Sequence, residues 1–367
     1  MNRTIKRVVA PAGAALMLAA ALSACGAGNE DTGSAGSDAS SSGESLSGTL
    51  SGAGASSQEA AVSAWQQGFQ SANPDVTVNY DPVGSGGGRE QFIAGGIDFA
   101  GSDAYLEDDE LTGAKDRCGG NIVEVPTYVS PIAVIYNLEG VDELNLTPAV
   151  VGDIFEGTVT TWDDPKIAAD NPDADLPNTA ITPVHRSDDS GTTENFTDYL
   201  DQTSGGTWSG GAIQTWPIQG GEGAEGTSGV VSAVQGGDGT IGYADASQAG
   251  DLGVAKIGVG DAFVEPTADA AAAVLDESTQ VEGRDAGDIA FTVNRTTTES
   301  GVYPIVLVSY MIACEKYEDA AQGELVKGFL TYVSSQEGQE AAAKGAGSAP
   351  ISEDLEATIR PIVEKIS

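Results

Sequence analysis

Residues 76–102 read VTVNYDPVGSGGGREQFIAGGIDFAGS, and they show the pattern that decides the fold. Residues 76–80 alternate apolar and polar side chains, as a half-buried strand does. A glycine-rich loop follows at 84–88, the apolar pair at 92–93 belongs to a helix, and a second strand includes 97–99. A strand, a loop, a helix and a strand in this order predict an α/β protein.

Strand and helix signals alternate outside this stretch as well. Their alternation predicts a largely parallel sheet covered by helices. No internal repeat of solenoid period is present. The expected strands are 49–53, 132–136 and 303–313, and the expected helices are 56–69, one that opens at Thr147-Pro148, and one through Leu325, Phe329 and Tyr332.

The N-terminus has the pattern of an export signal. Three basic residues within the first seven precede an apolar run at 8–22, which is too short and too rich in Ala and Gly for a membrane-spanning helix. The run ends in Leu22-Ser23-Ala24-Cys25, which resembles the bacterial lipobox. This resemblance implies that residues 1–24 are cleaved and that Cys25 receives a lipid; the alternative is an ordinary secretory signal with an unrelated cysteine.

The segment after Cys25 is a linker. Residues 26–45 consist mostly of Gly, Ser, Ala and acidic residues, without a bulky apolar side chain. Such a segment buries too little area to offset the entropy lost on ordering. We therefore expect residues 25–46 to be the lipidated cysteine and a flexible tether, and the rest of the chain is long enough for two lobes.

The net charge of −39 excludes some partners. Nucleic acids and anionic membrane surfaces require a basic footprint, which this sequence lacks. A buried anion site is still compatible with the charge, because distant surface charges are screened beyond about 10 Å at moderate salt. Any anion that this protein binds therefore needs a local pocket of donors.

The scarcity of cysteine and histidine argues against several kinds of chemistry. With Cys25 assigned to lipid, Cys118 and Cys314 remain, and they form either one disulfide or two free thiols. A single histidine, His185, gives no zinc cluster. A Ser-His-Asp hydrolase would depend on His185 alone, and no Gly-x-Ser-x-Gly motif accompanies it.

Four segments place small or hydroxyl residues at the ends of expected strands. Ligands bind at such positions in open α/β sheets, and three of the four lead toward a helix whose free N–H groups attract an anion. Arg186 adds a charged, two-pronged donor. The segments are 52–57 (GAGASS), 84–88 (GSGGG), 101–103 (GSD) and 186–192 (RSDDSGT).

Two other glycine-rich patterns do not indicate a nucleotide site. Residues 221–226 match the dinucleotide fingerprint, with Asp245 about 20 residues further on, but Glu222 and Glu225 would repel a pyrophosphate. The loop at 84–88 lacks the Gly-Lys-Ser/Thr ending of a P-loop. We therefore expect no nucleotide and no cofactor.

Over essentially all of residues 47–367, the chain resembles the periplasmic phosphate-binding proteins of phosphate ABC transporters. This resemblance implies a two-lobed fold closed by two hinge strands, near 130–132 and 308–310. Lobe I would comprise 47–130 with 310–367, and lobe II 131–309, which places Cys118 and Cys314 together in lobe I and favours their disulfide. The matching pieces are GAGASS at 52, VNYDPVGSGGG at 78, IDFAGSDAYL at 97, GDIFEGTVTTWDDP at 152 and HRSDDSGTTENFTDYL at 185.

The resemblance also implies the ligand set. Asp188 would orient Arg186 instead of binding the anion, and His185 would lie on a strand and point away from the pocket. Asp103 would accept a proton carried by the ligand, and the alternative is that it caps a helix near Leu106. The implied phosphate-binding residues are Ser56, Ser57, Ser85, Asp103, Arg186, Ser190, Gly191 and Thr192.

One position departs from the family, whose first loop often reads Thr-Phe where this chain has Ser56-Ser57. The apolar lid that the Phe supplies is absent, although the N–H of Ser57 can still donate.

The implied function is that of a monomeric binding lipoprotein, not an enzyme. It would be anchored outside the cytoplasm to the cell membrane, bind inorganic phosphate, and deliver it to the permease subunits of an ABC importer. The alternatives are a binding protein for sulfate, molybdate or a phosphonate, a secreted phosphatase, and an adhesin that kept the fold.

Overall fold

The computed structural model describes residues 46–367. Its first strands pair in parallel: β1 (Gly48–Gly54) has β2 (Val76–Asp81) on one side and β3 (Phe99–Ser102) on the other. The connecting helices are α1 (Glu59–Ala72) and α2 (Ser85–Ile93), and α3 (Asp108–Cys118) follows β3. The βα pattern of the N-terminal sequence is therefore confirmed.

Two long buried strands form the centre of the molecule. β14 (Val306–Cys314) pairs antiparallel with β3 on one side and with β4 (Ile122–Asn137) on the other. β4 continues past Pro131, where its partner changes from β14 to β8 (Thr240–Asp245). The sheet of the described residues runs in the order β2-β1-β3-β14-β4-β8-β6-β7.

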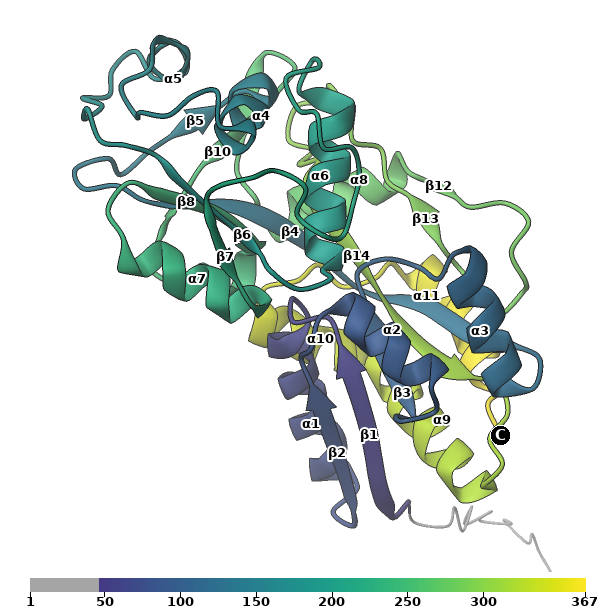
Figure 1. Cartoon of the computed structure of the whole chain (residues 1–367). Coiled ribbons are helices and arrows are strands. Elements are labelled where there is room, and N and C mark those ends of the chain that lie inside the picture. The colour runs from purple at the N-terminus through teal and green to yellow at the C-terminus, as the bar shows by residue number, and fades with distance from the viewer. Residues whose placement is uncertain (1–45) are drawn as a thin grey trace, which may run out of the picture. The chain divides into compact units, whose positions relative to one another are not determined.

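These pairings separate two lobes, which lie in the lower and upper halves of Figure 1. We use lobe I for the part built on β1, β2 and β3, and lobe II for the part built on β6, β7 and β8. Lobe I also contains the C-terminal helices, α9 (Ala320–Ser334), α10 (Gln336–Ala346) and α11 (Glu353–Val363).

Lobe II has its own helices and a small second sheet. Its strands in the main sheet are β6 (Thr182–Arg186), β7 (Glu222–Ala224) and β8, with β9 (Gly253–Val254) paired to β4. The second sheet contains β5 (Asn145–Leu146), β10 (Lys256–Val259) and β11 (Ala262–Val264). The helices are α4 (Pro148–Glu156), α5 (Pro165–Asp170), α6 (Gly191–Thr203), α7 (Gly226–Gly236) and α8 (Ala268–Asp276), and the hairpin β12 (Thr279–Gln280) and β13 (Phe291–Thr292) follows.

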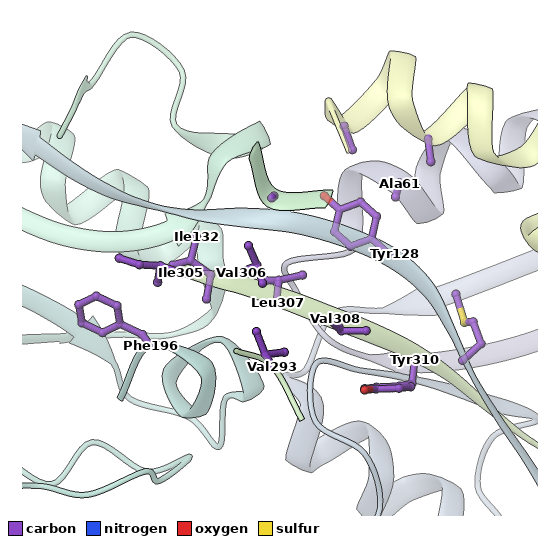
Figure 2. Packing of buried hydrophobic residues seen from close by; sticks show 14 of the residues in the cluster. Ala61, Tyr128, Ile132, Phe196, Val293, Ile305, Val306, Leu307, Val308 and Tyr310 are labelled. Atoms are coloured by element: carbon purple, nitrogen blue, oxygen red, sulfur yellow. The ribbon is translucent and has the colours of Figure 1, made fainter. Parts of the chain in front are cut away.

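The hydrophobic core follows β14 through the middle of the molecule. Every residue of β14 is buried. Figure 2 shows its apolar side chains between Phe196 of α6 and Ala61 of α1. A strand that is apolar on both faces must be covered on both faces, which explains the continuous apolar run in this part of the sequence.

Several expected boundaries were wrong, and two of the differences affect the loop after β1 and the central strand β4. α1 begins at Glu59 and not at residue 56, so that Ser56 and Ser57 lie in the loop after β1. β4 begins at Ile122 and is much longer than the expected strand at 132–136. The polar residues Glu124, Thr127 and Ser130 hid this strand because they interrupt its apolar pattern, although all three are buried in the fold.

The predicted disulfide is confirmed. Cys118, at the end of α3, is bonded to Cys314, at the end of β14, and their Cα atoms are 5.2 Å apart. Replacing both cysteines with Ser should lower the free energy of unfolding by about 2–5 kcal/mol, because the bond closes a long loop in the unfolded chain. Denaturant unfolding of the wild type and the double variant measures this, and two alkylatable thiols in unreduced protein would contradict the bond.

Buried Asp245 at the end of β8 should make stability depend on pH. Burial raises the pKa of Asp245 to about 6, and hydrogen bonds from Ser247 and Tyr128 only partly oppose this. The unfolded chain, with the ordinary pKa of 3.8, releases this proton first as pH rises. The contribution of Asp245 to stability therefore falls between about pH 4 and 6, by up to about 3 kcal/mol, and stays low above that.

Asp245→Asn should remove this dependence. The wild type should lose up to about 3 kcal/mol of its free energy of unfolding between pH 4 and 7 that the variant does not lose. Denaturant titrations of both proteins across this range provide the measurement. The same pH dependence in both would show that Asp245 titrates normally.

Candidate functional site

Three of the four predicted segments meet beside Asp103, which follows β3 and is 3% exposed. The hydroxyl of Ser57, in the loop after β1, donates to the Asp103 carboxylate at 2.7 Å from each oxygen. The backbone N–H of Asp103 donates to Oγ of Ser85, the first residue of α2, at 3.1 Å. The starts of α1 and α2 and the end of β3 therefore come together in lobe I.

The start of α6 in lobe II completes this arrangement. Thr192 Oγ1 donates to Asp103 Oδ2 at 3.0 Å, and Asn195 Nδ2 donates to the Asp103 carbonyl at 2.8 Å. A Cβ at Gly191 would lie 2.7 Å from both Asp103 Cβ and Ser85 Oγ, so glycine allows the helix to approach this closely. Ser190 caps the helix, its Oγ accepting from the N–H of Thr193 at 3.1 Å.

Arg186, at the end of β6, is 2% exposed and paired with Asp188. Arg186 Nε donates to Asp188 Oδ1 at 2.7 Å, and Nη2 donates to Oδ2 of the same carboxylate. The Gly226 N–H, at the start of α7, also donates to Asp188 Oδ1, at 3.1 Å. Burial opposes the charge of Asp188, but the Arg186 hydrogen bond and charge, with the Gly226 bond, lower the pKa of Asp188. Asp188 therefore holds the guanidinium in a fixed plane.

Gly84 allows the Arg186–Asp188 pair to lie against the start of α2. A Cβ at Gly84 would be 2.5 Å from Asp188 Oδ2, and its φ of +89° is a conformation that glycine adopts at no steric cost. The Gly86 N–H donates to the Asp189 carbonyl at 3.2 Å. The glycine loop at 84–88 thus contacts the Arg186 segment directly, as their shared position at strand ends predicted.

Ser56 joins lobe I to α7. Its Oγ accepts from the Thr227 N–H at 3.0 Å and also shares a hydrogen bond with Thr227 Oγ1 at 3.0 Å. The Gln248 side chain donates to the Ser56 carbonyl at 2.9 Å. Ser56 is buried, and its hydroxyl contacts lobe II instead of Asp103.

Sequence reasoning missed Gly226, Thr227 and Ser309. Ser309 on β14 donates from Oγ to Asp103 Oδ1. The signal for the first two was present, because Gly-Thr precedes an apolar helical pattern at the end of 221–226, a segment considered only as a dinucleotide motif. Ser309 lies in the predicted hinge strand, but its contact with Asp103 depends on a strand pairing that the sequence does not reveal.

Burial, hydroxyl hydrogen bonds and the charge of Arg186 determine the electrostatics of Asp103. Burial raises the pKa of Asp103, and the hydrogen bonds from Ser309, Ser57 and Thr192 oppose this only in part. Helices α1, α2 and α6 begin beside the carboxylate, and the starts of helices attract anions through their free N–H groups. Within residues 46–367, no group of three or more His, Cys, Asp or Glu side chains is placed to hold a metal ion.

His185 lies on β6, as predicted, and stacks on the ring of Trp216, with centroids 4.9 Å apart. Its Nδ1 lies 3.0 Å from the Arg186 carbonyl. It makes no hydrogen bond to Asp103.

A family model described as a PBP superfamily domain matches residues 39–337. The phosphate-binding protein PstS2 of Mycobacterium bovis is 36% identical over 374 residues, which cover 98% of this chain and 99% of that protein. The phosphate-binding protein PstS 3 of Mycobacterium leprae is 37% identical over 325 residues, covering 86% and 87%. The chain therefore belongs to the PBP superfamily and, within it, to the family of phosphate-binding proteins.

Solved structures confirm the two-lobed fold. A high-affinity periplasmic phosphate-binding protein bound with phosphate at pH 8.5 superimposes with a TM-score of 0.70 at 24% identity, covering 86% of this chain and 93% of the other. A putative phosphate ABC transporter substrate-binding protein from Clostridium perfringens, with bound phosphate, gives a TM-score of 0.59 at 21% identity, covering 82% and 98%.

Proposed function

We propose that this protein binds inorganic phosphate between lobe I and lobe II and delivers it, outside the cytoplasm, to the permease subunits of an ABC importer. One observation carries the proposal: the loop before α1 and the starts of α2 and α6 meet at Asp103, and the charge of buried Arg186 acts on its carboxylate. The relatives' names, phosphate-binding protein, support the choice of ligand.

The proposed ligand residues supply mostly neutral donors. The Ser57 and Thr192 hydroxyls donate to Asp103, which would accept a phosphate proton. The groups that would bind the phosphate oxygens are the Arg186 guanidinium, the hydroxyls of Ser56, Ser85 and Ser190, and the backbone N–H groups of Ser57, Gly191 and Thr192. Such a site needs little net positive charge, which suits a chain of net charge −39. Donors of this kind stabilise the bound ground state as well as a transition state, and such uniform binding does not accelerate a reaction. We therefore propose a binding protein without catalysis.

The proposed boundaries place lobe I at 47–130 with 310–367 and lobe II at 131–309. The change of partner along β4 supports the first boundary, because Pro131 is opposite Val306 on β14 whereas Ile132 is opposite Asp245 on β8. Movement of lobe II about these strands would open the site. We propose that the protein acts as a monomer.

Phosphate should stabilise the fold if the proposal is right. At a hundred times its Kd, phosphate adds about 2.7 kcal/mol to the free energy of unfolding, because only the folded chain binds it. Thermal unfolding of the purified protein with phosphate, and with sulfate at the same ionic strength, tests this. A melting temperature that phosphate leaves unchanged would contradict the proposal.

We also propose that lipidated Cys25 anchors the protein to the cell membrane after removal of residues 1–24. The signal, Cys25 and the tether 25–46 lie outside the described residues, apart from Leu46. No helix within residues 46–367 is long and apolar enough to cross a membrane. Cys25→Ser should leave the protein without lipid, as an unprocessed precursor or released from the envelope. Mass spectrometry of native protein checks this, and an unmodified N-terminus would contradict the anchor.

A further inference from the structure

Three hydroxyls from three separate elements satisfy most of the Asp103 carboxylate. Ser57 donates from the loop after β1, Thr192 from α6 and Ser309 from β14. Within the described part of the chain, no cationic side chain is hydrogen-bonded to this carboxylate. An ionised carboxylate has about four acceptor sites, so three hydroxyl protons leave one site for a proton on a ligand.

Strand register places Ser309 beside Asp103. In the antiparallel pairing of β14 with β3, Tyr310 is opposite Ser102. Continuing this register by one residue puts Ser309 directly opposite Asp103, and directly opposed residues project from the same face of a sheet. The backbone register of β14 on β3 therefore places the Ser309 hydroxyl beside the Asp103 carboxylate.

A register shift coincides with this position. Along β14, Ser309 is opposite Tyr128 of β4, but Tyr310 is opposite Pro126, so β4 carries one extra residue, Thr127, at this point. Such bulges change the local twist and the direction of side chains, and they often lie next to functional sites. Figure 2 shows Val308 and Tyr310, the neighbours of Ser309, on this strand.

We infer that Ser309 is a positioning residue of the anion site, whose hydroxyl keeps the Asp103 carboxylate ionised and oriented to accept a proton from the ligand. The inference rests on the proposed function, and it adds a selectivity role for a residue of the strand between the lobes. Ser309 is fully buried.

Loss of this hydroxyl should change selectivity and not only affinity. With two donors instead of three, buried Asp103 binds a proton of its own more readily. A neutral carboxyl group can donate to a ligand oxygen, so phosphate loses its proton acceptor while sulfate gains a donor. The charge of Arg186 of β6 opposes this change, and Tyr80 of β2, whose pKa is raised by burial and by the charge of Asp103, stays neutral beside it.

Calorimetric titration of the full chain with phosphate and with sulfate tests the inference, in the wild type, Ser309→Ala and Ser130→Ala. Ser130 is the matched control, a buried serine on neighbouring β4 that makes no hydrogen bond to Asp103. In Ser309→Ala the ratio of phosphate to sulfate affinity should fall about tenfold or more, because a hydrogen bond to a buried charge is lost. The fall should be larger at pH 6 than at pH 8, and the Ser130→Ala ratio should equal that of wild type.

The outcomes separate the inference from the proposed function. If Ser309→Ala has the same ratio of phosphate to sulfate affinity as the wild type at both pH values, Ser309 does not position Asp103. The proposed phosphate site is then unaffected. If both alanine variants weaken the binding of phosphate and of sulfate by the same factor, the two serines only support the fold, and the inference is overturned. If the wild type itself binds no phosphate, the proposed function fails.

Discussion

Arg186→Ala should weaken phosphate binding by about 2–5 kcal/mol, the largest single loss expected from this site. Arg186 is 2% exposed and is held by Asp188 through two hydrogen bonds. Removing it takes away the charged donor and leaves the half-buried Asp188 carboxylate without its partner, near the proposed anion site. Both effects oppose an anion, and calorimetric titration with phosphate measures their sum.

Arg186→Lys is the matched control for charge. It keeps the positive charge but lacks the planar pair of donors that Asp188 fixes, so its affinity should lie between that of the wild type and of Arg186→Ala. If Asp188 acts only through the arginine, Asp188→Ala should weaken phosphate binding less than Arg186→Ala does. Wild-type affinity in Arg186→Ala would place the anion elsewhere.

Asp103→Asn should narrow the selectivity for phosphate over sulfate, which we expect to be on the order of 10³-fold or more in the wild type. The ionised Asp103 carboxylate only accepts hydrogen bonds, and both common forms of phosphate carry a P–OH group that can donate to it. Sulfate has no proton at neutral pH, so its oxygen would face a carboxylate oxygen without a hydrogen between them. Arsenate, which is protonated like phosphate, should bind nearly as well.

The asparagine variant keeps the shape of the side chain and can donate from its amide to a ligand oxygen. We therefore expect it to fold, to bind sulfate more tightly than wild type and to bind phosphate less tightly. Titration of both proteins with both anions at pH 7 gives the ratio. If the ratio of phosphate to sulfate affinity is the same in the variant and the wild type, Asp103 has only a structural role, such as shaping the turn before α3.

Much of the site was predictable because its residues lie at strand ends. The Gly84 loop and the segment from Arg186 to Thr192 each carry a local signal, because each follows a strand of a parallel set, β1 with β2 and β6 with β8. The two sets run in opposite directions, since antiparallel β14 and β4 lie between them, and their strand ends therefore face each other. The pairing of Cys118 with Cys314 depended on the resemblance to a family, because the bond closes a loop that no local pattern describes.

The missed contacts are those that depend on the packing of distant segments. The Ser309 hydroxyl reaches Asp103 only through the register of β14 on β3, and Ser56 meets Thr227 only when lobe II lies against lobe I. The Ser56-Ser57 variant of the first loop also has a local explanation: the Ser57 hydroxyl bonds to Asp103 at the position where the family often has an apolar side chain. Sequence identifies these residues as polar and small, but their partners are set by the fold.

The most direct test of the account is a calorimetric titration of the wild-type protein with phosphate and with sulfate at pH 7 and at two salt concentrations. We expect one phosphate bound per chain, with an affinity that changes little with salt because the donors are buried. We expect sulfate to bind more weakly, by a factor on the order of 10³ or more. Equal binding of the two anions, or no heat of binding with phosphate, would contradict it.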